Sequence, residues 1–286
     1  MLLAVLSDIH GNLPALEAVL EALEAFAVDG FILAGDFVGG PQVNETLDWL
    51  RSLKIWGIKG NADINLIQYD NGTAPQAWRH SKQFSLARWA HRNIHPSHLD
   101  YLKKLPEQIT VEMMGRTSIR VVHGSPRDPY ESIFPDKNPE SLKLALAQIP
   151  ERTCVFGHTH IPWKQVCSGK MALNPGAVCG ALNGDVRAQF ALLMWENDHW
   201  QVEHQAVPYD HARSRRAFEE SGLLEEAGAL AKAFLLSNET GQNVGDFFLK
   251  YAYRLAAEAG YGDCQVVPDP IWDRASETFN WARYGG

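Results

Sequence analysis

Hydrophobic and polar positions follow two alternating periods along the first sixty residues. Apolar runs typical of buried strands occur at 2–6, 30–34 and 55–58, and each is followed by glycine or polar residues. Between the first two runs, Leu16, Val19, Leu20 and Leu23 recur at helical spacing, and a second helix is predicted over 42–53. This β-α-β-α-β order is typical of a sheet covered by helices, with functional residues at the strand ends.

The middle of the chain predicts a second set of elements. Helical runs occupy residues 74–104, and residues 109–124 predict a hairpin that turns at Gly115. A helix over 139–149 then precedes another buried run at 153–156. From 164 to 206 the chain alternates and turns at "SGK", "NGD" and "END", which predicts antiparallel strands of a second sheet.

The character of the chain changes near Val207. Residues 209–259 are rich in Ala, Leu and Glu and predict helices, without the metal-ligating residue types of the earlier strand ends. An aromatic tail follows, and packing on its own chain is favoured over a partner interface. Its large side chains are Trp272, Phe279, Trp281 and Tyr284. We therefore predict one domain over 1–207 and a helical extension with an aromatic tail over 208–286; the extension could also form a homo-oligomer contact or a lid.

Composition narrows the classes of partner. The 286 residues suffice for one main core with an appendage, and the net charge of -8 disfavours binding to duplex nucleic acid or to an anionic membrane. No apolar run approaches the ~20 residues that cross a bilayer, and the first residues lack the positive charge of a signal peptide. The four cysteines have neither metal nor disulfide spacing. We expect a cytoplasmic protein that acts on a small substrate.

Five predicted strand ends carry side chains of the kind that bind metal ions. They are Asp8 and His10 after the first strand, then Asp36, Asn61, His123, and the pair His158 and His160. Residues two apart in an extended chain project to the same side, so Asp8 and His10 are expected to point together. A single histidine after a strand is usually a hydrogen-bonding residue, but five such ends in one chain favour a shared metal site.

The residue types also indicate the reaction. Two divalent ions about 3.5–4 Å apart repel each other, so a carboxylate must bridge them. Oxygen and imidazole ligands together suit Mn, Fe or Zn better than Ca, and the missing thiolate argues against a structural zinc site. Such a pair holds phosphate oxygens and generates hydroxide at neutral pH. Hydrolysis of a phosphate ester is therefore the predicted chemistry.

The elements "DIH", "GD", "GNAD", "VHG" and "GHTH", in this order within residues 4–195, resemble the calcineurin-like metallophosphoesterase family. The stretches "GDFVGG", "VVHGSPRDP" and "LNPGAV" are similar to a bacterial and archaeal branch of predicted phosphodiesterases. The resemblance implies an α/β fold, a four-layer α-β-β-α sandwich of two mixed sheets. It also implies two divalent ions, with Mn expected and Fe, Zn, Mg or Ni as alternatives.

The resemblance assigns the ligands to two metal sites. One site comprises Asp8, His10, Asp36 and His160, and the other comprises Asp36, Asn61, His123 and His158. Asp36 is then the bridge, and a water or hydroxide held between the ions attacks phosphorus. A phosphodiester of a small or nucleotide-like molecule is the leading substrate. A phosphomonoester, and a scaffold or regulatory protein with weakened catalysis, are the alternatives.

One position departs from the family pattern. Most members carry histidine where this chain has Ala62, and that histidine is assigned as the acid that protonates the leaving oxygen, held by the following acid, here Asp63. Loss of a general acid costs about 10²- to 10⁴-fold in rate. Either the substrate has an easily departing group, or another residue supplies the proton. The candidates for that second case are His80, His91, His95 and His98.

Three further residues have two interpretations each. Asn12 either contacts phosphate or a ligand, or caps the helix that starts near Leu13. Arg127 either holds a phosphate oxygen or forms an ion pair with Asp128. Asn174 either orients a metal ligand or serves the turn at "NPG".

Overall fold

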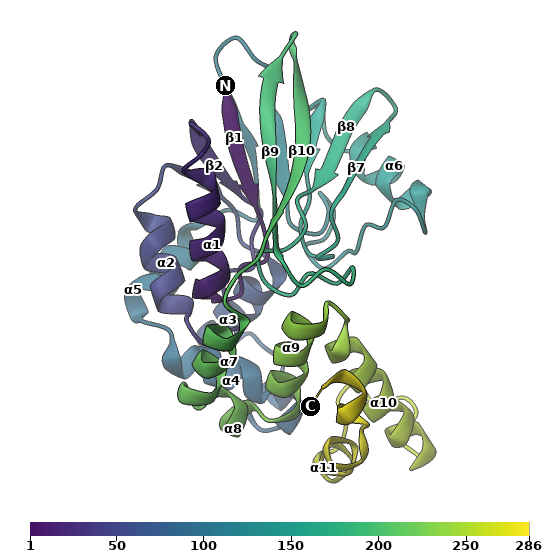
Figure 1. Cartoon of the computed structure of the whole chain (residues 1–286). Helices are drawn as coiled ribbons and strands as arrows, with labels where there is room; N and C mark the ends of the chain where they lie inside the picture. The colour runs from purple at the N-terminus through teal and green to yellow at the C-terminus, as the bar shows by residue number, and fades with distance from the viewer. Residues whose placement is uncertain (286) are drawn as a thin grey trace.

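The computed structural model describes residues 1–285 and contains two five-stranded sheets with helices on their outer faces (Figure 1). The first sheet has the order β10-β9-β1-β2-β3, and the second has the order β4-β5-β6-β8-β7. The first comprises β1 (Leu2–Leu6), β2 (Gly30–Leu33), β3 (Ile55–Gly57), β9 (Ala188–Glu196) and β10 (His199–Val207). The second comprises β4 (Gln108–Val111), β5 (Ile119–Val122), β6 (Thr153–Val155), β7 (Trp163–Cys167) and β8 (Lys170–Asn174). Both sheets mix parallel and antiparallel pairs, which confirms the predicted sandwich.

The two sheets pack face to face through aliphatic side chains. Leu3 and Val5 of β1 belong to the same buried cluster as Val121 of β5 and Val155 of β6. Ala4 and Leu6 point to the other face of the first sheet, toward the helices. Because β1 is buried on both faces, its sequence is a continuous apolar run and does not alternate with polar residues.

Helices complete the outer layers. The first sheet is covered by α1 (Leu13–Leu23), α2 (Val43–Arg51), α3 (Asn61–Asn71), α4 (Ser85–Asn93) and α5 (Pro96–Lys104). The second is covered by α6 (Pro139–Ala147), whose Leu142 and Leu146 belong to one cluster with Phe156. Short 3-10 turns occupy η1 (Gln76–Arg79), η2 (Lys82–Phe84) and η3 (Trp281–Tyr284). Across residues 1–285, no helix combines the length and apolar character needed to span a bilayer.

Two predictions about these elements were wrong. The strands between 164 and 206 do not all belong to the second sheet, because β9 and β10 join the first sheet beside β1, with Leu3 opposite Leu193. Alternation reveals antiparallel pairing but does not say which sheet a hairpin joins. In addition, helix α3 begins at Asn61, before the helical runs predicted over 74–104, and its only buried side chains are Asp63 and Leu66. A helix with so few apolar contacts leaves little periodic signal.

The C-terminal extension contains α7 (His211–Glu220), α8 (Leu223–Ala227), α9 (Ala229–Thr240), α10 (Val244–Glu258) and α11 (Asp269–Thr278). Phe218, Leu223 and Leu235 share a buried cluster with α1 and α4, so the first part of the extension packs on the sandwich. The rest forms its own core around Phe248, which meets Trp272 edge to face at 5.1 Å. The aromatic tail therefore packs on its own chain, and the green-to-yellow helices lie beyond the end of β1 (Figure 1).

Phe248→Ala should destabilise this second core. Phe248 is fully buried and also stacks on Trp281 at 5.2 Å, so truncation leaves a cavity worth about 3–5 kcal/mol of unfolding free energy. Urea unfolding followed by circular dichroism measures the loss. The neighbouring Phe247→Ala is the matched control because Phe247 is 41% exposed, and it should cost far less. Equal losses for the two variants would contradict this core.

Candidate metal centre

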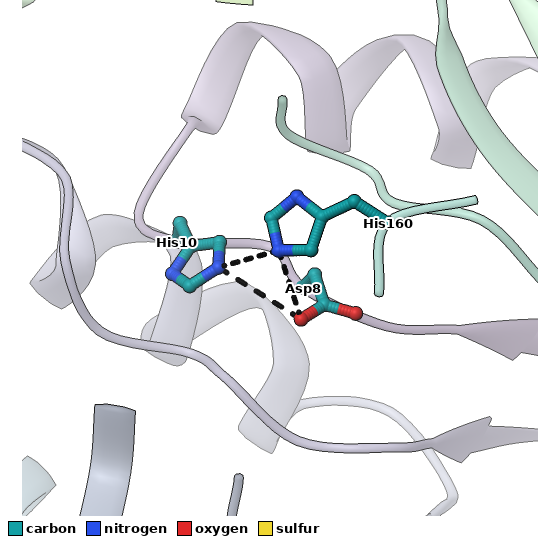
Figure 2. Close-up of side chains that lie close together, drawn as sticks. All are labelled: Asp8, His10 and His160. Carbon is teal, nitrogen blue, oxygen red and sulfur yellow. Dashed lines mark hydrogen bonds and ion pairs between the residues drawn. The ribbon is translucent and has the colours of Figure 1, made fainter. Parts of the chain in front are cut away.

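All seven predicted ligands lie at the carboxyl ends of β1, β2, β5 and β6 and at the start of α3 after β3. The Asp8 carboxylate oxygen Oδ1 lies 3.2 Å from Nε2 of His160 and 3.9 Å from Nε2 of His10 (Figure 2). These three side chains come from segments 150 residues apart in sequence. They meet because β1 and β6 are interior strands of the two facing sheets.

Asp36 and Asn61 extend the cluster. Oδ2 of Asp36 lies 3.6 Å from Nε2 of His10 and 3.4 Å from Nε2 of His123, so this oxygen is close to one histidine from each assigned metal site. Oδ1 of Asn61 lies 2.9 Å from Nε2 of His123 and 2.7 Å from Nδ1 of His158. Two groups of three side chains are therefore close enough to hold a metal ion. One consists of Asp8, His10 and His160, and the other of Asp8, Asp36 and His123. Asp8, like Asp36, is thus placed to serve both.

Five of the seven residues have left-handed backbone conformations. Their φ angles are 55° at Asp8, 46° at His10, 59° at Asp36, 67° at His158 and 57° at His160. Asp8 and His10 point together as expected, but the extended backbone predicted to bring this about was wrong. A positive φ is uncommon for residues with a side chain, and such strain gathers at functional sites. The fold holds these loops in an unfavourable conformation that turns the side chains toward one another.

Backbone carbonyls fix the orientation of three imidazoles. Nδ1 of His10 donates to the Val38 carbonyl, and Nδ1 of His160 donates to the Gly180 carbonyl, both at 2.7 Å. His123 makes the equivalent bond to Ala34, also at 2.7 Å. Because a carbonyl only accepts, Nδ1 carries the proton in each ring and a neutral ring presents the Nε2 lone pair to the centre. This arrangement is usual for metal-binding histidines.

The polar atoms of the centre fit a cation. Nε2 of His10 and Nε2 of His160 lie 3.3 Å apart, and two neutral lone pairs at that separation repel each other. Oδ1 of Asp8 is buried, and within residues 1–285 it has no hydrogen-bond donor unless a neighbouring imidazole is protonated. Burial opposes a charged imidazole, yet the Asp36 and Asp8 carboxylates outweigh it and raise the pKa of His123 to about 10. Mixed oxygen and imidazole donors that demand positive charge suit divalent transition metals.

The comparisons with known proteins agree with this geometry. The family model described as the calcineurin-like phosphoesterase superfamily domain matches residues 1–198. The chain belongs to this superfamily. The metallophosphoesterase of Sphaerobacter thermophilus is 30% identical and superposes with a TM-score of 0.67, covering 84% of this chain and 100% of that one.

Two archaeal proteins are also similar to this phosphoesterase superfamily member. An uncharacterized protein of Methanocaldococcus jannaschii is 26% identical over 246 residues, which is 79% of this chain and 96% of that protein. A hypothetical protein of Pyrococcus horikoshii is 21% identical with a TM-score of 0.67, covering 79% of this chain and 95% of that one, and shares the fold. The match to most of each relative includes part of the C-terminal extension.

Asp63 supports the candidate metal centre through backbone hydrogen bonds. Its Oδ2 accepts hydrogen bonds from the backbone N–H groups of Gly60 (2.9 Å) and Asp36 (3.0 Å). Its Oδ1 accepts from the N–H groups of Phe37 (3.0 Å) and Val38 (3.2 Å). Burial and the nearby Asp36 charge raise the pKa of Asp63 to about 7, against these four N–H groups. The carboxylate expected to hold a general acid here fastens the Asp36 loop to α3.

The other predicted residues lie outside the cluster of ligands. Asn12 caps α1 by accepting from the Ala15 N–H at 3.2 Å, and its amide donates to Sγ of Cys179 at 3.4 Å. Arg127 is exposed, and its Nε donates to Glu131 at 2.9 Å, so the ion pair is not with Asp128.

Asn174 has both of the predicted roles, in the turn and beside the metal-binding histidines. Its oxygen accepts from the Gly176 N–H at 2.9 Å within the turn, and its amide donates to the Gly157 carbonyl at 2.6 Å. The same amide lies 3.2 Å from Oγ1 of Thr159, between His158 and His160. Asn174 therefore orients the loop that carries these two histidines.

The four histidines considered as replacement acids have other contacts. His91 pairs with Asp70 at 2.9 Å, and His98 lies 3.3 Å from Asp48. His95 caps α5, and His80 is exposed. None of the four lines the cavities beside Ala62.

Sequence reasoning missed two contributors to the site. Phe234 of α9 meets the His10 ring edge to face at 5.4 Å, although no residue of the extension was predicted at the site. Tyr130, in the loop after His123, donates through its hydroxyl to Asn65 of α3 at 2.6 Å. Phe234 gave no signal because a phenylalanine in an amphipathic helix looks like any core residue. The "YES" stretch around Tyr130 likewise carries no metal-ligand pattern.

Asp63→Asn should loosen the metal centre without removing a ligand. An amide presents one acceptor oxygen instead of two, so buried N–H groups of the Asp36 loop lose their partners. We expect metal affinity to fall about 10- to 100-fold and the unfolding free energy to fall by about 2–3 kcal/mol. Calorimetric titration with Mn²⁺ and urea unfolding measure these. Asp100→Asn, at a side chain that is 67% exposed, is the control and should change neither.

Metal binding should strengthen as pH rises. The pKa values of His123 and His160 are raised, so in the metal-free protein these imidazoles hold protons that a metal ion must displace. The raised folded pKa of His123 also gives stability that is complete below 6.5 and is lost as pH rises toward 10. Thermal unfolding should therefore show the metal-free protein weakening over this window, with Mn²⁺ restoring it. A metal affinity independent of pH would contradict the assignment.

Proposed function

We propose that this chain is a metal-dependent phosphodiesterase that acts on a small or nucleotide-like substrate. The observation that carries the proposal is the position of Asp36, whose Oδ2 lies within 3.6 Å of His10 and 3.4 Å of His123. One carboxylate oxygen between two histidine groups is what a pair of divalent ions requires. Manganese is favoured, with Fe, Zn, Mg or Ni as alternatives, because the donors are oxygen and imidazole without thiolate.

The roles of the chain's own groups follow from their contacts. When bound, two divalent ions neutralise phosphoryl charge and lower the pKa of the attacking water. Asp8, Asp36 and Asn61 would supply oxygen atoms to the ions. The histidines other than His158 would supply Nε2, because Nδ1 of each bonds to a backbone carbonyl, and His158 would supply Nδ1, which lies 2.7 Å from Oδ1 of Asn61. Asp63 keeps Asp36 in place, and the Ala62 N–H donates to Oδ1 of Asp36 at 2.8 Å. The ligands are therefore preorganised before substrate arrives.

Ala62 decides the kind of substrate. Its methyl group cannot protonate a leaving oxygen, and the four alternative histidines are engaged or exposed elsewhere. The reaction therefore favours phosphodiesters or activated phosphates whose leaving groups depart as anions. Phosphomonoesters with poor leaving groups should react more slowly.

Ala62 also supports a second candidate, a regulatory protein with weakened catalysis. The strained ligand loops argue against it. Each residue held at positive φ costs about 1 kcal/mol or more, and five of them belong to the ligand set. A protein that only docked to partners would have no reason to keep that cost.

Hydrolysis of bis(p-nitrophenyl) phosphate with added Mn²⁺ tests the enzyme. We expect turnover of this diester to exceed that of p-nitrophenyl phosphate. Asp36→Asn should lower kcat/KM by at least about 10²-fold because the shared carboxylate loses its charge. Asp100→Asn serves as the control on an exposed surface. No turnover with any divalent metal would rule out the enzyme.

A series of aryl phosphodiesters from p-nitrophenyl to phenyl tests the role of Ala62. In the native chain the rate should fall steeply as the leaving group becomes more basic. Ala62→His should flatten that dependence by supplying a proton donor, so the poorest leaving group should gain up to about 10²-fold relative to p-nitrophenolate. A rate of the native chain that does not depend on leaving-group basicity would refute the missing-acid explanation.

A further inference from the structure

Two cavities meet beside the metal centre. One, of about 270 Å³, extends between α3, α4 and the η turns, and the other, of about 260 Å³, is bordered by His10, His160 and Phe234. They share four lining residues, Gly39, Ala62, Leu86 and Leu230. We call the two together the apolar cavity. Each part alone is slightly smaller than the ~300–1,000 Å³ typical of small-molecule sites, and the two together fall within that range.

The walls of the apolar cavity are largely hydrocarbon. Leu66, Phe84 and Leu249 border the larger part, and Trp78 stacks on Phe84 with ring centres 5.1 Å apart. The side chain of Gln83 turns its amide to Tyr253 and accepts from the Val267 N–H, so its polar atoms are already paired. Within the part of the chain that the structure describes, no Asp, Glu, Lys or Arg lines either part.

The apolar cavity is continuous with the metal ligands. His10 and His160 form part of its wall, and Gly39 lies against His10, where a Cβ would come within 3.0 Å of Nδ1. Ala62 borders both parts and follows the ligand Asn61 directly. A larger side chain at position 62 would project into the junction. The alanine that lacks a proton donor therefore also keeps the passage open.

We propose that the apolar cavity binds an uncharged, flat aromatic ester group of the substrate while the phosphoryl group lies at the metal centre. This inference rests on the proposed function. An aromatic ring gains free energy from contact with these walls, whereas a charged group would be desolvated without a partner. The helical extension supplies Leu230, Phe234 and Leu249, so substrate choice depends on residues outside the segment matched by the family model.

Binding of two phosphonates to the Mn²⁺-loaded full chain tests the cavity without any reaction. Phenylphosphonate should bind at least about 10-fold more tightly than methylphosphonate by isothermal titration calorimetry, because only the phenyl ring fills the cavity. Equal affinities, or binding of neither compound, would overturn the proposal. This comparison needs no variant.

Two cavity variants locate the effect. Leu230→Trp should fill the junction and reduce the phenyl preference to about 2-fold or less, and Leu249→Trp should have the same effect by filling the larger part from α10. Leu144→Trp is the matched control on α6, where Leu144 is 52% exposed, and should keep the full preference. A preference that survives both cavity variants, each verified as folded by circular dichroism, would place the phenyl site elsewhere and overturn the proposal.

Kinetics with methyl phenyl phosphate and methyl hexafluoroisopropyl phosphate separate this inference from the proposed function. The two leaving alcohols have similar acidity, but only phenol is aromatic, so a higher kcat/KM for the phenyl ester, by about 10-fold, supports the cavity. Hydrolysis of both esters at equal rates supports the phosphodiesterase and contradicts the cavity. Tighter binding of phenylphosphonate without hydrolysis of bis(p-nitrophenyl) phosphate supports the cavity and contradicts the proposed function.

Discussion

The main constraint on this structure is that buried acceptor atoms, which repel each other, are held together at one end of the sandwich. Two carboxylates and the lone pairs of the imidazoles converge in a region from which water is largely excluded, and His10 and His160 alone bring two Nε2 atoms to 3.3 Å. Such an arrangement is unstable unless positive charge is present, as protons or as metal ions. The strained φ angles, the carbonyls behind the rings and Asp63 beneath the Asp36 loop all serve to hold these atoms together. The fold is therefore less stable than it could be, because it keeps a cation site preorganised.

Most of the framework could be predicted because it follows from burial. The run at β1 is apolar on both faces, which indicates a central strand, and the polar residues after each strand fall where parallel sheets gather their loops. The sheet that β9 and β10 join could not be predicted, since the alternation of a hairpin is the same in either sheet. The start of α3 at Asn61 was hidden because its N-terminal turn is determined by Asp63 and the Asp36 loop, a long-range contact.

Some features of the candidate site could likewise be predicted from the sequence, and others could not. Residue type and position were enough to predict seven candidate ligands that the structure brings together, because few other arrangements of Asp, Asn and His follow five strands in order. The conformation of those ligands could not be predicted, since a left-handed Asp8 or His10 is imposed by tertiary contacts against local preference. The same holds for Phe234, whose edge contact with His10 depends on how α9 packs against the sandwich. Contacts between distant segments, rather than local pattern, determine what surrounds the ligands.

Ala62 connects the chemistry to the choice of substrate. A histidine there would supply a proton, but its ring would occupy the junction between the two parts of the apolar cavity. An alanine gives up the proton and opens that space, so the loss of one function and the gain of the other have a single cause. The two effects are also chemically consistent, because an aromatic alcohol is more acidic than an aliphatic one and departs more readily without protonation. A cavity that selects aromatic esters would therefore select the substrates that least need the missing acid.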